Sequence, residues 1–88
     1  MPSYLVETYL SRCHTADRAE CEARARSAAA ELTRSGTRVR FGGVIHVPED
    51  ETCFFVFDAP SSRDAERVAE RAALGAVRVV EAVTSREE

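Results

Sequence analysis

The spacing of apolar residues switches four times along this 88-residue chain between the period of a strand and that of a helix. Two stretches, 15–35 and 61–74, repeat small apolar side chains three and four residues apart, which indicates helices. Four runs rich in β-branched and aromatic residues are typical of strands: 3–10, 37–47, 52–59 and 76–83. The sequence therefore predicts the element order β-α-β-β-α-β.

That order joins two β-α halves in the split pattern of the ferredoxin-like fold. Right-handed crossovers would place both helices on one face of a four-stranded antiparallel sheet, with the first and third strands in its centre. We therefore expect an α+β protein with a single ferredoxin-like domain over residues 1–88, of which 85–88 form a frayed tail. The expected assembly is a dimeric α+β barrel.

Residues typical of helix ends and strand bulges support these boundaries. Gly36 and Gly75 are expected to end the two helices, and Gly42-Gly43 to mark a bulge or a close backbone approach in the second strand. Ser61, followed three residues later by Asp64, resembles the start of a capped helix. The helix stripes expected in the core are Cys21, Ala25, Ala28, Ala29 and Leu32, then Ala65, Val68, Ala69 and Ala72.

The third predicted strand is apolar on both sides. Alternation puts Cys53, Phe55 and Phe57 on one side and Phe54 and Val56 on the other, and the sequence leaves open which side faces the helices. A half-exposed antiparallel strand should alternate apolar with polar residues. Two or three large side chains left in water forfeit several kcal/mol, at roughly 25 cal/mol per Å². We therefore expect a homodimer formed through the open sheet face.

Composition excludes several classes of protein. The formal net charge is -3, and the arginines alternate with acidic residues, unlike the basic face of a nucleic-acid binder. No apolar run approaches the roughly 20 residues of a membrane span, and the N-terminus lacks the pattern of a signal peptide. The three cysteines, Cys13, Cys21 and Cys53, do not suggest a disulfide scaffold. The lack of a signal peptide and of a disulfide scaffold favours a cytoplasmic protein. The basic residues are all arginine, which favours a bacterial source.

Three segments carry a family resemblance: YLVETYL near the N-terminus, PEDETCFFVFDAPS from Pro48, and ERAALGAVRVVEAV from Glu70. Together they resemble DUF4242, a family of small bacterial proteins of unknown function, over nearly the whole chain. The resemblance implies a ferredoxin-like fold and self-association, and leaves the function unassigned.

One actinobacterial branch of that family is described as nickel-binding, with histidines on the first strand and along and just after the second helix. The matching positions here are Thr8, Tyr9, Ala69 and Leu74. None of these side chains can replace an imidazole, so nickel binding is only a weak alternative for this chain.

Other metal chemistry has little support. His14 and His46 are weak candidate ligands, but the sequence contains neither CxxC nor HxxxH, and a transition-metal site needs three or four convergent ligands. We expect no metal and no cofactor.

An acid–base site is conceivable on two strands. If Glu7, Tyr9, Arg40 and His46 share one face of the sheet, they could converge in a small polar pocket, where burial would make Glu7 a candidate base. The alternative that we favour is that Glu7 pairs with an arginine across the dimer interface and fixes its register. No catalytic residue is therefore assigned.

Two hypotheses of function follow. The first is a non-catalytic domain that binds a small hydrophobic molecule or a protein partner. The second is an enzyme resembling the dimeric α+β-barrel oxygenases, some of which need no cofactor, acting on a hydrophobic substrate. The second rests on fold analogy. A cleft between sheet and helices containing His46 or Glu7 would favour the enzyme.

Overall fold

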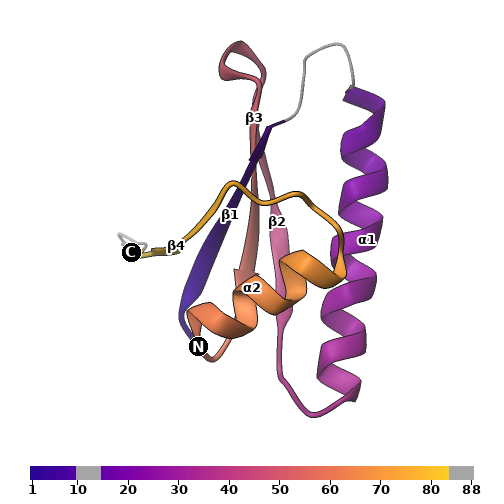
Figure 1. Cartoon of the computed structure of the whole chain (residues 1–88), viewed down its shortest axis with the longest axis vertical. Helices are drawn as coiled ribbons and strands as arrows, with labels where there is room; N and C mark the ends of the chain where they lie inside the picture. The colour runs from indigo at the N-terminus through magenta and orange to yellow at the C-terminus, as the bar shows by residue number, and fades with distance from the viewer. Residues whose placement is uncertain (10–14, 84–88) are drawn as a thin grey trace, which may run out of the picture.

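The computed structural model describes residues 1–9 and 15–83. Strands and helices follow one another in the predicted order (Figure 1). Their bounds are β1 Ser3–Tyr9, α1 Thr15–Arg34, β2 Arg40–Val47, β3 Thr52–Asp58, α2 Ser62–Arg71 and β4 Arg78–Ala82, with a short 3₁₀ turn, η2, at Pro48–Asp50. The end of the first predicted strand at residue 10 and the expected tail at 85–88 lie outside the described residues.

The four strands form one antiparallel sheet in the order β2-β3-β1-β4. The first and third strands are therefore central, as predicted. Helix α1 packs against β2 and α2, and α2 packs against β1 and β4. This is a ferredoxin-like α+β arrangement, and it leaves two edge strands, β2 and β4.

Burial along the central strands shows which face the helices cover. On β1 the buried residues are Tyr4, Val6 and Thr8. Their neighbours on β3, aligned by the register, include the buried Phe55 and Phe57. The helix-facing side of the sheet thus carries Cys53, Phe55 and Phe57, which settles the question of side that the sequence left open. The residues between them point to the other face.

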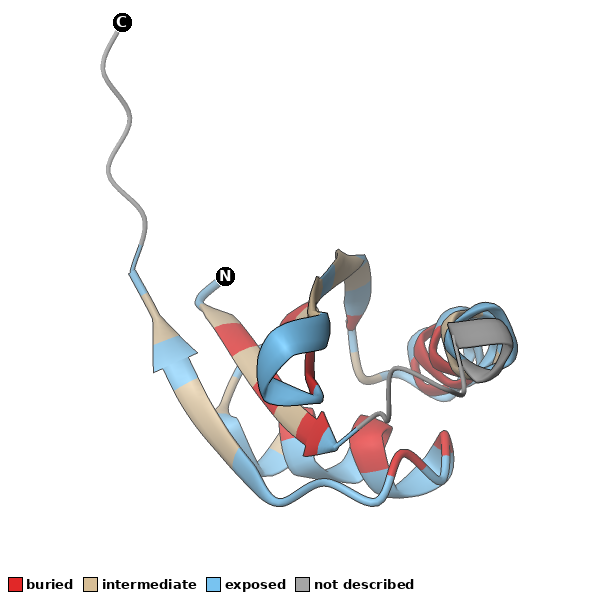
Figure 2. Ribbon diagram, turned by 90° about the horizontal axis from the view of Figure 1, so that it is seen from above, coloured by how far each residue is buried: buried red, intermediate tan, exposed pale blue. Residues whose placement is uncertain are grey.

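The helices close the core with small side chains. The predicted stripes are buried, apart from Cys21, which is half-buried. The buried side of α1 is the one turned toward the sheet (Figure 2). Because alanine has no side chain beyond Cβ, the helices can lie close to the aromatic layer below them. Phe41 from β2 fills the outer part of that layer, with its ring centroid 5.4 Å from that of Phe57.

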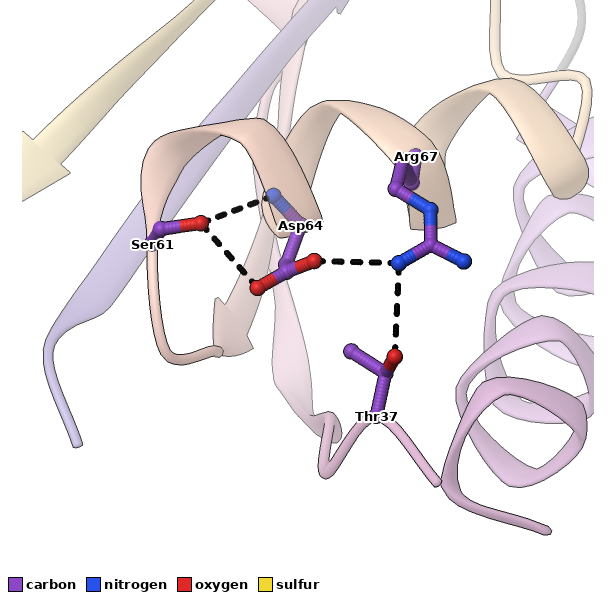
Figure 3. Close-up of polar contacts among 4 residues, drawn as sticks. All are labelled: Thr37, Ser61, Asp64 and Arg67. Atoms are coloured by element: carbon purple, nitrogen blue, oxygen red, sulfur yellow. Dashed lines mark hydrogen bonds and ion pairs between the residues drawn. The ribbon is translucent and has the colours of Figure 1, made fainter. Parts of the chain in front are cut away.

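The start of α2 is capped as the sequence predicts. The Ser61 hydroxyl accepts a hydrogen bond from the backbone N–H of Asp64 at 3.2 Å (Figure 3). Asp64 in turn accepts a hydrogen bond from Arg67, whose guanidinium also reaches the Thr37 hydroxyl at 3.3 Å. The cap therefore connects α2 to the loop that follows α1.

The two helix ends differ. Gly36 ends α1 with φ +105°, and the Thr37 N–H donates to the carbonyl of Leu32, as in a Schellman motif. The prediction for α2 is wrong in position: the left-handed residue after the helix is Ala73, with φ +54°, and not Gly75. Gly75 also has positive φ, in the connection to β4.

The register of β2 on β3 shifts between Phe41 and Gly43, which confirms the predicted bulge. One extra residue in a strand reverses which positions share a face. Arg40 lies opposite Asp58, whereas His46 lies opposite Cys53. The two residues therefore sit on opposite faces, although their sequence positions share one parity.

Of the two helices described in 1–9 and 15–83, neither is long and apolar enough to cross a membrane.

Candidate functional site: the open face of the sheet

The face of the sheet away from the helices, here called the open face, receives side chains from all four strands. Because directly opposed residues in an antiparallel ladder project to the same side, the register defines its rows. The middle row consists of Gly43, Val56, Leu5 and Val80; the next contains Ile45, Phe54, Glu7 and Arg78; and the opposite end contains Arg40, Asp58, Ser3 and Ala82.

The centre of the open face is apolar and partly exposed. Leu5, Phe54, Val56 and Val80 are each half-buried, covered only by their neighbours in the sheet. Ile45, on the edge strand β2, is 52% exposed. An apolar patch that spans four strands without a covering layer is typical of a surface that binds another molecule.

A polar pair borders this patch on the side of β4. The Nε of Arg78 donates to the Oε1 of Glu7 at 3.0 Å. The Glu7 side chain is 19% exposed and that of Arg78 is 63% exposed. Glu7 therefore finds its arginine within its own chain, contrary to the expectation that the arginine would come from a second copy.

A second polar group borders the patch at the other end. The Ser3 hydroxyl donates to the Oδ1 of Asp58 at 2.6 Å, and Arg40 lies opposite Asp58 on the edge strand. The open face is thus an apolar band between two polar borders, which is the usual composition of a protein interface.

The structure does not bring together the four residues of the acid–base hypothesis. Glu7 and the 71% exposed Tyr9 lie on the open face. Arg40 lies at the far end of that face, two rows from Glu7, and His46 lies on the helix-facing side. The bulge in β2 is the physical reason, because it moves His46 to the side opposite Arg40.

On the helix-facing side, His46, Cys53 and Thr8 lie in one row across three strands. Among the residues described, the buried Nε2 of His46 has no hydrogen-bond partner. Burial raises the pKa of the Cys53 thiol, while the charge of Arg18 opposes that rise. A neutral, fully buried thiol is a core group and a poor nucleophile.

The positions matched to nickel ligands are also dispersed. Thr8 is buried under the helices, Tyr9 points to the open face, and Ala69 and Leu74 are buried in and after α2. Across residues 1–9 and 15–83, no group of three or more His, Cys, Asp or Glu side chains could hold a metal ion. His14 and Cys13 lie outside the described residues.

Sequence reasoning missed two residues of the open face. Arg78 was not predicted to pair with Glu7, and Ile45 was not predicted to face away from the helices. The placement of both residues depends on strand register. That of Arg78 follows from the pairing of β1 with β4, and that of Ile45 from the bulge that precedes it in β2. The Gly42-Gly43 pair was the only available signal for Ile45.

The fold has a solved counterpart. The crystal structure of SCO4226 from Streptomyces coelicolor A3(2) superposes on this chain with a TM-score of 0.76, covering 96% of this chain and 99% of that one. The two sequences are 16% identical, so the likeness concerns the fold. No protein-family model and no curated protein matches the sequence.

Proposed function

We propose that this protein is a non-catalytic interaction domain that forms a homodimer through its open face. The observation that carries the proposal is the apolar band of Leu5, Ile45, Phe54, Val56 and Val80, to which all four strands contribute a large side chain and which no helix covers. Packing against the same band of a second copy would remove both from water and satisfy a two-fold axis.

The size of the open face is compatible with such a dimer. Four strands spaced about 4.8 Å apart and about seven residues long at 3.4 Å each give a projected area of about 450 Å². The accessible area of such a corrugated surface exceeds its projection. A stable interface buries about 800 Å² per partner, so this face and its polar borders are of the required order.

The separation of Glu7 from His46 supports a binding role over catalysis. General acid–base chemistry needs its groups within hydrogen-bond reach of one reacting atom. The sheet lies between these two residues, and neither lines any of three grooves on the described surface that lie beside the helices. The proposal of an interaction domain needs no such convergence.

Sedimentation equilibrium tests the proposal. The wild-type protein should be dimeric at micromolar concentration, and Ile45→Glu should weaken association at least tenfold, since a desolvated charge costs more than about 1.4 kcal/mol. Val77→Glu is the matched control, because Val77 is 51% exposed but lies just before β4, in a groove beside α2 and away from the open face. It should leave the dimer intact.

Two results would refute the dimer: a wild-type monomer at these concentrations, or equal dissociation of Ile45→Glu and Val77→Glu. Because Ile45 is half exposed, circular dichroism should show that both variants are folded.

The same proposal extends to location: a bacterial cytoplasm. Cys21 and Cys53 are both free thiols in the structure, and free thiols persist most readily in a reducing compartment. Mass spectrometry of the protein alkylated directly in cell lysate tests this, because reduced Cys21 should be recovered.

A further inference from the structure

A groove separates α2 from the connection leading into β4. It is lined from α2 by Glu66, Ala69, Glu70 and Ala73, and from the connection and strand by Gly75, Ala76, Val77, Arg78 and Val79. Its volume is about 480 Å³, within the range of about 300–1,000 Å³ of small-molecule sites. Apart from Arg78, which borders the open face, the lining residues lie on the side of the sheet that α2 covers, so a dimer formed through the open face would leave most of the groove accessible.

The floor of the groove is apolar. Val77 is 51% exposed there, and Val79 beside it is half-buried against the core. Alanines at 69, 73 and 76 contribute only methyl groups, which keeps the groove open. An alkyl chain placed along this floor would shield Val77 from water, and that burial favours binding.

The α2 wall of the groove carries two carboxylates of the same sign. Glu66 and Glu70 are four residues apart on one helix face, an arrangement that costs a few tenths of a kcal/mol in an isolated helix. Both are exposed, and in the described part of the chain neither forms an ion pair within 4 Å.

Three arginines around the groove have other partners, whereas the exposed Arg63, three residues before Glu66, forms no ion pair within 4 Å among the described residues. Arg67 pairs with Asp64 at 3.1 Å and Arg71 with Glu31 at 3.3 Å. Arg78, which lines the groove, pairs with Glu7. The groove therefore combines an apolar floor with a wall on which two carboxylates form no ion pair among the described residues.

We propose that this groove binds a small organic cation, an ammonium or guanidinium group on an apolar chain. The cationic group would lie against Glu66 and Glu70, and the chain would lie along Val77 and Val79. The charge of the wall selects against anions, and the apolar floor selects against a bare cation. The volume corresponds to one small ligand. This inference does not require the proposed dimer. The two surfaces meet only at Arg78, which pairs with Glu7 at the border of the open face and also lines the groove.

Hexylammonium is a suitable probe, followed by ¹H–¹⁵N NMR titration of the wild-type protein. Amide shifts should be saturable and confined to 66–79. Hexanoate tests the charge and ammonium ion tests the apolar chain. We expect both to bind at least tenfold more weakly than hexylammonium. Equal shifts with hexanoate, or no saturable shifts with hexylammonium, would overturn the proposal.

Variants locate the two interactions. The double variant Glu66→Gln/Glu70→Gln should weaken hexylammonium binding about threefold per carboxylate and about tenfold in total. Glu49→Gln/Glu51→Gln removes the same charge from the exposed β2–β3 turn and should leave the affinity unchanged. Val77→Ser should weaken hexylammonium but not ammonium ion. If the two glutamate double variants behave alike, the cation does not bind in this groove.

Discussion

Glu7 on β1 and Arg78 on β4 form a cross-strand pair, with 3.0 Å between Oε1 and Nε, at the border of the open face. The carboxylate is mostly covered, whereas the guanidinium is mostly exposed. An acidic residue on a central strand is therefore satisfied without any second chain.

We expect this pair to stabilise the fold only modestly. Exposed ion pairs contribute about 0.2–1 kcal/mol, and the exposure of Arg78 places this one near about 0.5 kcal/mol. A double-mutant cycle with Glu7→Gln and Arg78→Ala, by urea denaturation at fixed protein concentration, should give that coupling energy in low salt. It should fall by about half or more in 1 M NaCl, where charges are screened within about 3 Å. A coupling energy that salt does not change would contradict this assignment.

Ala73 suggests a stabilising substitution. Its N–H donates to the Glu70 carbonyl and that of Leu74 to the Ala69 carbonyl, so Ala73 takes the left-handed position of a helix-ending motif. A side chain at positive φ costs about 1 kcal/mol, which glycine avoids. Ala73→Gly should therefore raise the free energy of unfolding by about 0.5–1 kcal/mol.

The control for Ala73→Gly is Ala30→Gly in the middle of α1, where the residue is exposed and helical. There glycine should lower stability by about 1 kcal/mol. Thermal unfolding of both variants checks the two opposite signs. If both are destabilised, Ala73 does not have the backbone conformation described.

The fold was predictable because the spacing of apolar residues and the positions of the capping and turn residues indicate the same element boundaries. Ser61 and Asp64 form the expected cap, and Gly36 ends α1 where expected. The prediction was wrong at the end of α2, because Gly75 is the more favourable residue for a left-handed position but tertiary packing places Ala73 there. The buried Leu74, which follows it, is the core contact that fixes this register.

The candidate site was less predictable, because the face of the sheet on which a side chain lies depends on the register between paired strands. Phe54 and Phe55 are equally apolar, so local sequence could not show which one the helices cover. The bulge at 42–43 then reverses the parity of β2, and the predicted grouping of Arg40 with His46 was wrong for that reason. What the sequence did show is that one apolar side of β3 would remain without a helix.

Arg24 connects the two helices. Its Nε donates to the Ala72 carbonyl at the end of α2 at 2.9 Å, and its Nη2 donates to the Cys21 sulfur at 3.2 Å. A cation at a helix C-terminus satisfies free carbonyls and interacts favourably with the helix dipole. We expect Arg24→Met, which keeps the apolar stem, to lower stability by about 1 kcal/mol.

The control for Arg24→Met is Arg63→Met, at the exposed first turn of α2. Its effect should remain within about 0.5 kcal/mol. Chemical denaturation of both variants makes the comparison, and hydrogen exchange should additionally show faster opening of 69–74 in Arg24→Met. Equal stability of the two variants would show that the contact at Ala72 contributes nothing.

Cys53 predicts how stability changes in alkali. Burial raises the pKa of its thiol above the ordinary value of 9.0. Below that value the thiol is neutral in both the folded and the unfolded chain, so it gives no pH dependence. Above it, the unfolded chain loses the proton while the folded chain retains it. Stability should therefore fall as the pH rises from about 9, by at most about 1.4 kcal/mol per pH unit.

Urea denaturation between pH 8 and pH 10.5 measures this slope, and the absence of lysine from the sequence removes one competing titration. Cys53→Ala should be less stable at every pH because of the cavity it leaves, but its stability should decline less steeply above pH 9 than that of the wild type. Cys21→Ala, at a half-buried position, should retain the wild-type slope. If Cys53→Ala and the wild type decline in parallel, the alkaline loss of stability has another origin.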